Sequence, residues 1–363
     1  MKYLKILKNL FLALITILAI LVIILFPEAS SAGALSGMHF CADMLIPAVF
    51  PFVFLSSWIV NSGLAKKLNK LCSKICSLMF FLPGSAAAVI VMGLIGGYPA
   101  GAKGIGDLFE NKLIDKNEAQ RMSFFLFGAG PAFIINIIGI KFLKNEPFAY
   151  QILLAQTLSS ILIGIFLGIY SRTQKQTNFK NLNKKIKLPN YEKQENMELT
   201  ISEAITKSCE STAVVVINMC ALVVLFSIII SFINKLNFEN NCQAFVGAIL
   251  EVTQGCAAIS KIGGTPALIS VFIAFGGFCV HCQILSILKK IKISYFKFLL
   301  ARLAHSAIAF FTTFLLTQNT RIQPVINIQT DLKLSAHICG SLALFLCCVY
   351  LLYLRLPERK AVG

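Results

Sequence analysis

Charged residues are scarce in this chain. They make up 13% of its 363 residues, and the 16 acidic residues are outnumbered by 33 lysines and arginines. Soluble globular domains carry roughly 25% charged residues, so the composition argues against a soluble domain. Hydrophobic residues reach 57%, and apolar runs such as 10–26 and 342–354 approach the roughly 20 residues that cross a bilayer as a helix. We therefore predict an all-α polytopic membrane protein, with the lipid bilayer as a partner.

Patterns of catalytic or metal-binding residues are also lacking. The stretch IGGYPAGAKGIG at 95–106 is glycine-rich, but Ala102 precedes Lys103 and no Ser or Thr follows it, so it does not match a phosphate-binding P-loop. Neither Cys72-x-x-x-Cys76 nor Cys279-x-x-Cys282 has a second ligand pair at zinc spacing. We recognise no Ser/His/Asp arrangement. The sequence therefore predicts no enzyme activity, no cofactor and no metal site.

Positive charge is abundant, with a net charge of +17. The lysines and arginines gather between the apolar runs, at 66–74, 172–193 and 289–292, which is the positive-inside pattern of cytoplasmic loops. We therefore expect no nucleic-acid partner. The N-terminus has lysines before its first apolar run, and Ala29–Ala34 resembles a signal-peptidase site; we expect a retained first helix.

The alternation of apolar runs and basic loops predicts a topology. If residues 2–8 and the loop 171–207 are both cytoplasmic, an even number of crossings separates the loops 66–74 and 171–207. Segments 78–120 and 242–262 are then left as re-entrant hairpins that enter the membrane and return. About eight transmembrane helices complete the fold, at 10–26, 44–61, 122–142, 148–170, 211–233, 265–287, 298–317 and 336–354.

The order of spans and hairpins occurs twice, once from each side of the membrane, which predicts an inverted-topology repeat. Glycine-rich breaks, at 128–131 and 276–277, interrupt the span after each hairpin. Such breaks are viable in a membrane where they line a cavity; close helix packing is the alternative. The predicted parts are an N-terminal helix and loop at 1–40, repeats at 41–170 and 208–320, a basic cytoplasmic loop at 171–207 and a C-terminal transmembrane helix at 321–363.

Ionisable residues inside apolar segments are functional candidates because a membrane makes them costly. Glu251 falls inside the second hairpin, where its carboxylate can bind a proton, a cation or a substrate hydroxyl, or pair with Lys261 or Arg302. Lys103 either pairs with Asp107 or faces a cavity. His281 and Gln283 follow the second glycine break and are further candidates. Arg302 and His305 are three residues apart, so they share one helix face.

Four motifs at these positions resemble the YlbJ (SpoVV) family of sporulation integral membrane proteins, which carry nucleoside recognition or Gate domains. They are GYPAGAK at 97–103, GPAF at 130–133, EVTQG at 251–255 and GGFCVHCQ at 276–283, and the similarity covers roughly residues 40–320. Gate proteins are in turn distantly similar to concentrative nucleoside transporters, which are built from inverted repeats with two re-entrant hairpins.

The resemblance implies a membrane transporter of a small polar, anionic or nucleoside-like solute, and for this branch dipicolinate transport across the outer forespore membrane. The alternative is a non-transporting membrane protein of sporulation that binds a ligand and signals or acts as a scaffold. Homo-oligomers are compatible with either. The candidate substrate-binding residues are Gly97, Tyr98, Pro99, Gly101, Lys103, Gly130, Pro131, Glu251, Thr253, Gln254, Gly255, Gly276, Gly277, His281, Gln283, Arg302 and His305.

Overall fold

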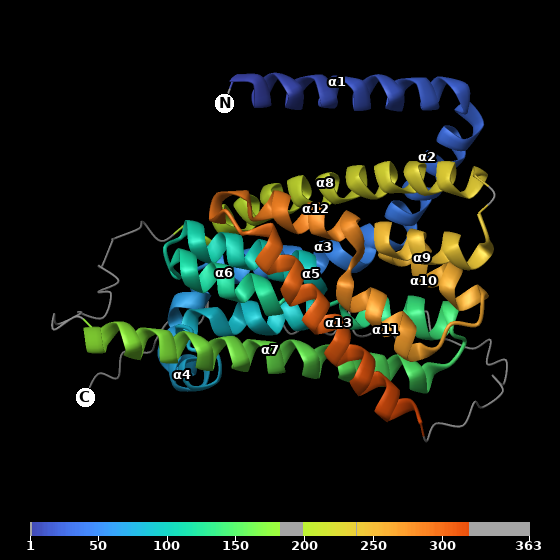
Figure 1. Cartoon of the computed structure of the whole chain (residues 1–363). Helices are drawn as coiled ribbons and strands as arrows, with labels where there is room; N and C mark the ends of the chain where they lie inside the picture. The colour runs from blue at the N-terminus through green and yellow to red at the C-terminus, as the bar shows by residue number, and fades with distance from the viewer. Residues whose placement is uncertain (1, 182–198, 237, 319–363) are drawn as a thin grey trace, which may run out of the picture. The chain divides into compact units, whose positions relative to one another are not determined.

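The structure is a computed structural model that describes residues 2–181, 199–236 and 238–318. Within these residues every regular element is a helix, as the composition predicted (Figure 1). The first half contains α1 (Lys2–Leu25), α2 (Pro27–Phe40), η1 (Cys41–Leu45), α3 (Ile46–Asn61), α4 (Leu64–Met79), η2 (Gly84–Ala86), α5 (Ala87–Glu110), α6 (Lys116–Phe125), η3 (Phe133–Phe142) and α7 (Glu146–Asn181). The second contains α8 (Ile201–Lys235), α9 (Asn240–Leu250), α10 (Val252–Lys261), α11 (Pro266–Phe275), α12 (Gly277–Ile287), η4 (Lys289–Ile291) and α13 (Tyr295–Thr317).

Within the described residues, six helical runs are long and apolar enough to cross a membrane. This confirms a multi-pass integral membrane protein. The runs are Pro27–Asn61, Gly84–Glu110, Glu146–Thr173, Ile201–Lys235, Pro266–Ile287 and Tyr295–Thr317.

The spans differ from the prediction in two places. The predicted helix 122–142 is divided into α6 and η3, because the Gly128–Pro131 stretch does not continue the helix. The predicted first span, 10–26, falls in α1, whose apolar part Thr16–Leu25 is shorter than the six runs. The predicted span 336–354 lies outside the described residues.

Two segments predicted as loops contain helix. Residues 27–40, placed in a loop, form α2, whose Gly33 allows the backbone of α8 to approach: a Cβ there would lie 2.7 Å from Ile228 Cα. The polar loop 171–207 is shorter than expected, since α7 continues to Asn181. A capping box, in which Thr200 and Glu203 each accept from the other's backbone N–H, starts α8.

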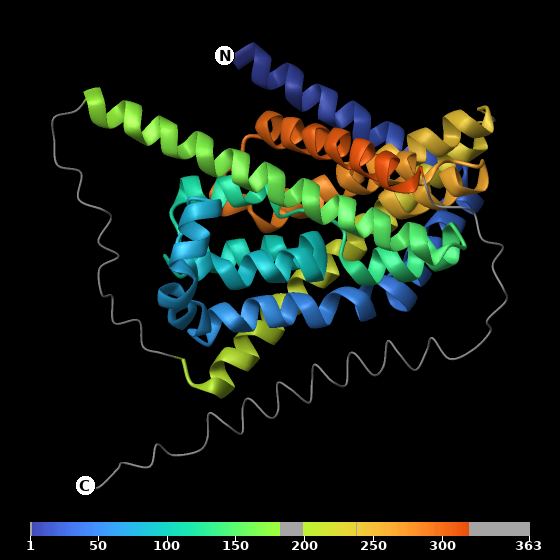
Figure 2. The same ribbon diagram turned by 90° about the horizontal axis from the view of Figure 1, so that it is seen from below.

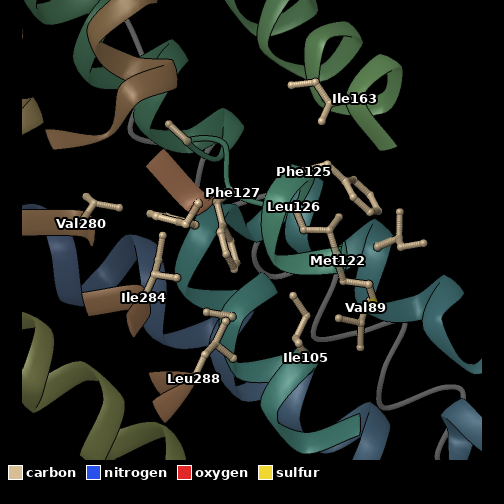
Figure 3. Packing of buried hydrophobic residues seen from close by; sticks show 14 of the residues in the cluster. Val89, Ile105, Met122, Phe125, Leu126, Phe127, Ile163, Val280, Ile284 and Leu288 are labelled. Atoms are coloured by element: carbon tan, nitrogen blue, oxygen red, sulfur yellow. The ribbon is translucent and has the colours of Figure 1, made fainter. Parts of the chain in front are cut away.

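The main apolar core surrounds the second half of α5 and residues 126–127, which follow α6. Figure 3 shows Met122, Leu126 and Phe127 packed with Ile105 and with Val280, Ile284 and Leu288 of the α12 region. Residues from both halves of the chain therefore share one core. Helix packing of this kind is stabilised in a membrane by close van der Waals contact rather than by exclusion of water.

The short helices gather at the two ends of this bundle. Figure 1 shows α4 and α6 near one end and the pair α9 and α10 at the other, with α5 and α11 reaching toward the middle. Figure 2 shows that α3, α5 and α7 run along the bundle. Residues of α5 and of the α9–α10 pair line one cavity, which is described below.

Candidate functional site

The first chain reversal occurs inside α5, at Gly97. Its backbone has φ 78° and ψ −172°, a conformation that side-chain-bearing residues rarely adopt. The helix folds back on itself there, since a Cβ on Gly93 would lie 3.2 Å from the Cα of Gly101. In a straight helix these two residues would be about 12 Å apart. The two halves of α5 are therefore antiparallel neighbours.

The second reversal occurs at Glu251, between α9 and α10. Its backbone is extended, with φ −139° and ψ 119°, and its carboxylate caps α10 by accepting from the N–H groups of Thr253 at 3.1 Å and Gln254 at 2.8 Å. The two helices touch closely, because a Cβ on Gly255 would lie only 1.9 Å from Ala248 Cα. The carboxylate thus has two backbone partners, and its position at a helix N-terminus stabilises negative charge.

Each reversal is seated against one of the two glycine breaks. Gly97 lies on the break between α6 and η3: a Cβ there would be 2.8 Å from the backbone N of Gly130. Similarly, Gly277, at φ 72°, lies on the second reversal, where a Cβ would be 3.1 Å from the carbonyl oxygen of Leu250. A Cβ at Gly97 would force the neighbouring backbone to shift, and a Cβ at Gly277 would be tight; the positive φ of both residues favours glycine as well.

Residues beside both reversals line the same cavity. Among the predicted site residues, the structure brings together Tyr98, Pro99, Gly130, Glu251, Thr253 and Gly276 on its wall. The polar side chains of this group are those of Tyr98, Glu251 and Thr253. Glu251 is 2% exposed.

Sequence reasoning missed the apolar wall of the cavity. Residues from α2, η1 and α3 cover one side, and η3 and α8 contribute more. Because these residues resemble any membrane-facing or core side chain, no local signal in the sequence distinguishes them. They include Phe40, Met44, Leu45, Ala48, Val49, Phe52, Phe133, Ile137 and Val223.

Lys103 is placed away from the cavity wall. It forms a buried ion pair with Asp107, one turn further along α5, so the pairing alternative of the sequence analysis is the one observed. The preceding turn is tied to α3 by the Ser56 hydroxyl, which donates to the carbonyl of Ala100 at 2.8 Å. Within the described residues, no Lys or Arg side chain lines the cavity.

Arg302 is fully buried and holds the ends of two interrupted helices. Its guanidinium donates to the carbonyls of Phe127 and of Phe124, the latter at 2.8 Å, and reaches that of Ala274 at 3.5 Å. These carbonyls end α6 and α11, where the helix dipole favours positive charge. Arg302 therefore connects the two breaks, and it is not paired with Glu251.

The remaining predicted side chains make their hydrogen bonds outside the cavity lining. His281 spans the second break, with Nε2 2.9 Å from the carbonyl of Phe275 and Nδ1 3.4 Å from the Tyr295 hydroxyl. His305 Nε2 lies 3.2 Å from the carbonyl of Gln156. Gln283 donates to the Cys279 sulfur and Gln254 to the Ser227 hydroxyl. Gly101, Pro131, Gly255 and Gly277 are outside the cavity lining.

The described residues contain no group of three or more His, Cys, Asp or Glu side chains able to hold a metal ion. The chemistry available in the cavity is therefore that of hydrogen bonding, one carboxylate and apolar contact. This combination suits reversible binding of a small solute.

Comparison with known proteins agrees with the motifs. The family model "Gate: Nucleoside recognition" matches residues 42–146, a range that contains the first reversal and its break. The sporulation integral membrane protein YlbJ of Bacillus subtilis (strain 168) is 23% identical over 319 residues, covering 78% of this chain and 76% of that protein. No solved structure matches significantly. The chain is therefore a multi-pass integral membrane protein that is similar to YlbJ and, over residues 42–146, to the Gate family model, as its four motifs predicted.

Proposed function

We propose that this protein is a transporter that binds a small polar solute between its two chain reversals. One observation carries the proposal: the reversals at Gly97 and Glu251, far apart in sequence, line the same cavity, and each is seated on a helix break. Broken helices at the site and a pair of matching segments are the features by which transporter sites are recognised.

The two reversals also support an inverted repeat. Gly93 and Gly101 flank Gly97 by four residues on each side, and Gly247 and Gly255 flank Glu251 in the same way. The helices of the two hairpins lie toward opposite ends of the bundle (Figure 1), and residues of both line the cavity. We propose that residues 41–170 and 208–320 are the two repeats, and that α5 and α9–α10 are re-entrant. Movement of one repeat against the other would then expose the cavity to each side in turn.

The side chains of the cavity favour a neutral solute that donates hydrogen bonds. The Glu251 carboxylate accepts, the Tyr98 and Thr253 hydroxyls donate or accept, and apolar residues form the wall. A nucleoside-like solute matches this combination. Dipicolinate carries two carboxylates and would meet Glu251 without a lysine or arginine nearby, so it fits only if protons or a cation neutralise it.

The proposal is tested with the purified full-length protein in detergent. A solute that binds the folded state at a hundred times its Kd stabilises it by about 2.7 kcal/mol, so its thermal unfolding shifts measurably. We expect a shift with nucleosides that Glu251→Gln abolishes. Glu239→Gln, the same charge change at the exposed start of α9, should retain it. A shift with dipicolinate alone would overturn the preference for a nucleoside-like solute.

Flux distinguishes transport from binding. In proteoliposomes, a transporter equilibrates the stabilising solute across the membrane at a rate that Glu251→Gln reduces. The alternative, a ligand-binding or scaffold protein, shows the thermal shift without flux, and that result would overturn the transport proposal. Because YlbJ is named a sporulation protein, we propose sporulation as the setting, which predicts expression confined to spore-forming cells.

A further inference from the structure

Helix α4 buries one face and exposes an apolar stripe that is bordered by lysines. Ala65 and Cys76 are buried against the bundle. Leu71, Ile75 and Leu78, spaced as one helix face, are 76%, 61% and 67% exposed. Exposed lysines at 66, 67, 70 and 74 border this stripe, because Lys67 and Lys74 each precede one of its leucines by four residues. The helix therefore presents an apolar stripe and a basic stripe side by side.

The orientation of α4 in the bundle suggests what its two stripes contact. It lies at one end of the bundle, and its axis runs across those of α3, α5 and α7 rather than along them (Figures 1 and 2). If the long apolar helices cross the membrane, α4 lies along the membrane surface. Helices with this pattern bury their apolar face at the level where headgroups meet acyl chains.

We propose that α4 is a binding surface for anionic phospholipid headgroups. In this orientation Leu71, Ile75 and Leu78 enter the acyl region, and Lys67, Lys70 and Lys74, at positions i, i+3 and i+7, face the headgroup phosphates. Charge complementarity selects the partner, since lysines at a membrane surface attract anionic rather than zwitterionic lipid.

The bound lipid would act on the first reversal, because α4 is packed tightly against the start of α5. A Cβ on Gly84 would lie 2.2 Å from the Asn69 carbonyl oxygen, and the Asn69 side chain accepts from the Ser85 N–H at 3.2 Å. At the other end of α4, Arg172 donates to the carbonyl of Ser77 at 2.9 Å. Lipid that restricts the movement of α4 would therefore also restrict Gly84 and Ser85, which lead into α5.

The test measures lipid bound to the full-length protein in neutral detergent by native mass spectrometry, with phosphatidylglycerol and phosphatidylcholine as probes. Each lysine near an anionic surface contributes about fivefold in affinity. We expect Lys67→Gln/Lys70→Gln/Lys74→Gln to weaken phosphatidylglycerol binding about tenfold or more. The control Lys144→Gln/Lys207→Gln/Lys261→Gln, with the same charge change at exposed lysines elsewhere, should weaken it less than about twofold.

Equal losses in the two triple variants, or equal binding of both lipids, would overturn the proposal. Equal competition by soluble glycerol phosphate would assign the site to a free anion instead. A second measurement does not depend on the triple variant. With the single tryptophan Trp58 replaced by Phe, brominated lipid should quench Leu71→Trp strongly and Ser73→Trp weakly; equal quenching would exclude a surface orientation for α4.

Discussion

The two chain reversals use the same spacing and place charge differently. In the first, Gly97 at the turn has no side chain, and the ionisable residues Lys103 and Asp107 neutralise each other behind it. In the second, the turn itself carries a carboxylate, held by two backbone N–H groups. Glycines flank both turns at equal distances. In the proposed site the first turn would therefore supply shape and the second would supply chemistry.

The largest expected effect follows from separating the ion pair. Lys103→Met leaves the buried Asp107 carboxylate uncompensated, which destabilises proteins by about 3–5 kcal/mol. The double variant Lys103→Met/Asp107→Leu removes both charges and should recover most of the loss. Thermal unfolding in detergent measures both. If the double variant is as unstable as the single one, Lys103 and Asp107 stabilise the fold by more than mutual charge neutralisation. The view that the first hairpin contributes only shape would then be wrong.

Gly255→Ala tests the close contact of the second hairpin. The added methyl would meet the Ala248 backbone at 1.9 Å, and overpacking costs about 1–3 kcal/mol, occasionally more. Gly247→Ala is the matched control on the facing helix, because its nearest neighbour would be 3.8 Å away. We expect thermal stability to fall for the first variant and to stay near wild type for the second; equal values would show that α9 and α10 are not in contact.

Gly97→Ala tests the first turn, and Gly63 provides its control. Both residues have a positive φ, but Gly63 (φ 77°, ψ −1°) lies in the left-handed region, and a Cβ there meets nothing within 4 Å. Gly63→Ala thus measures the cost of that left-handed backbone, about 1 kcal/mol. Gly97→Ala adds two costs, a backbone (φ 78°, ψ −172°) that is nearly confined to glycine and a clash with the Gly130 backbone, and we expect a further loss of about 1–3 kcal/mol. Similar losses in the two variants would show that the turn does not rest on the break.

The sequence predicted the features that membrane physics imposes and missed those set by tertiary contact. Apolar length and basic loops predicted a helical membrane protein, and glycines predicted the breaks, because both are consequences of local chain chemistry. The pairing of Lys103 with Asp107 was left open, since a helix turn places two such residues together whether or not a cavity lies nearby. The apolar wall from α2 and α3 was missed, because Phe40 and Phe52 follow no pattern that separates a ligand wall from a core.

The smallest effect on stability is expected for Glu251→Gly, which gives both reversals a glycine at the turn. Glu251→Gly converts the second turn to the residue of the first. Its extended backbone needs no special residue, and glycine replaces a capping side chain with a loss of only a few tenths of a kcal/mol. Stability should therefore stay close to wild type, while solute binding, followed as a thermal shift, should be lost. If Glu251→Gly binds the solute normally, both reversals supply shape alone, and the chemistry of the site resides in the Tyr98 and Thr253 hydroxyls and the backbone.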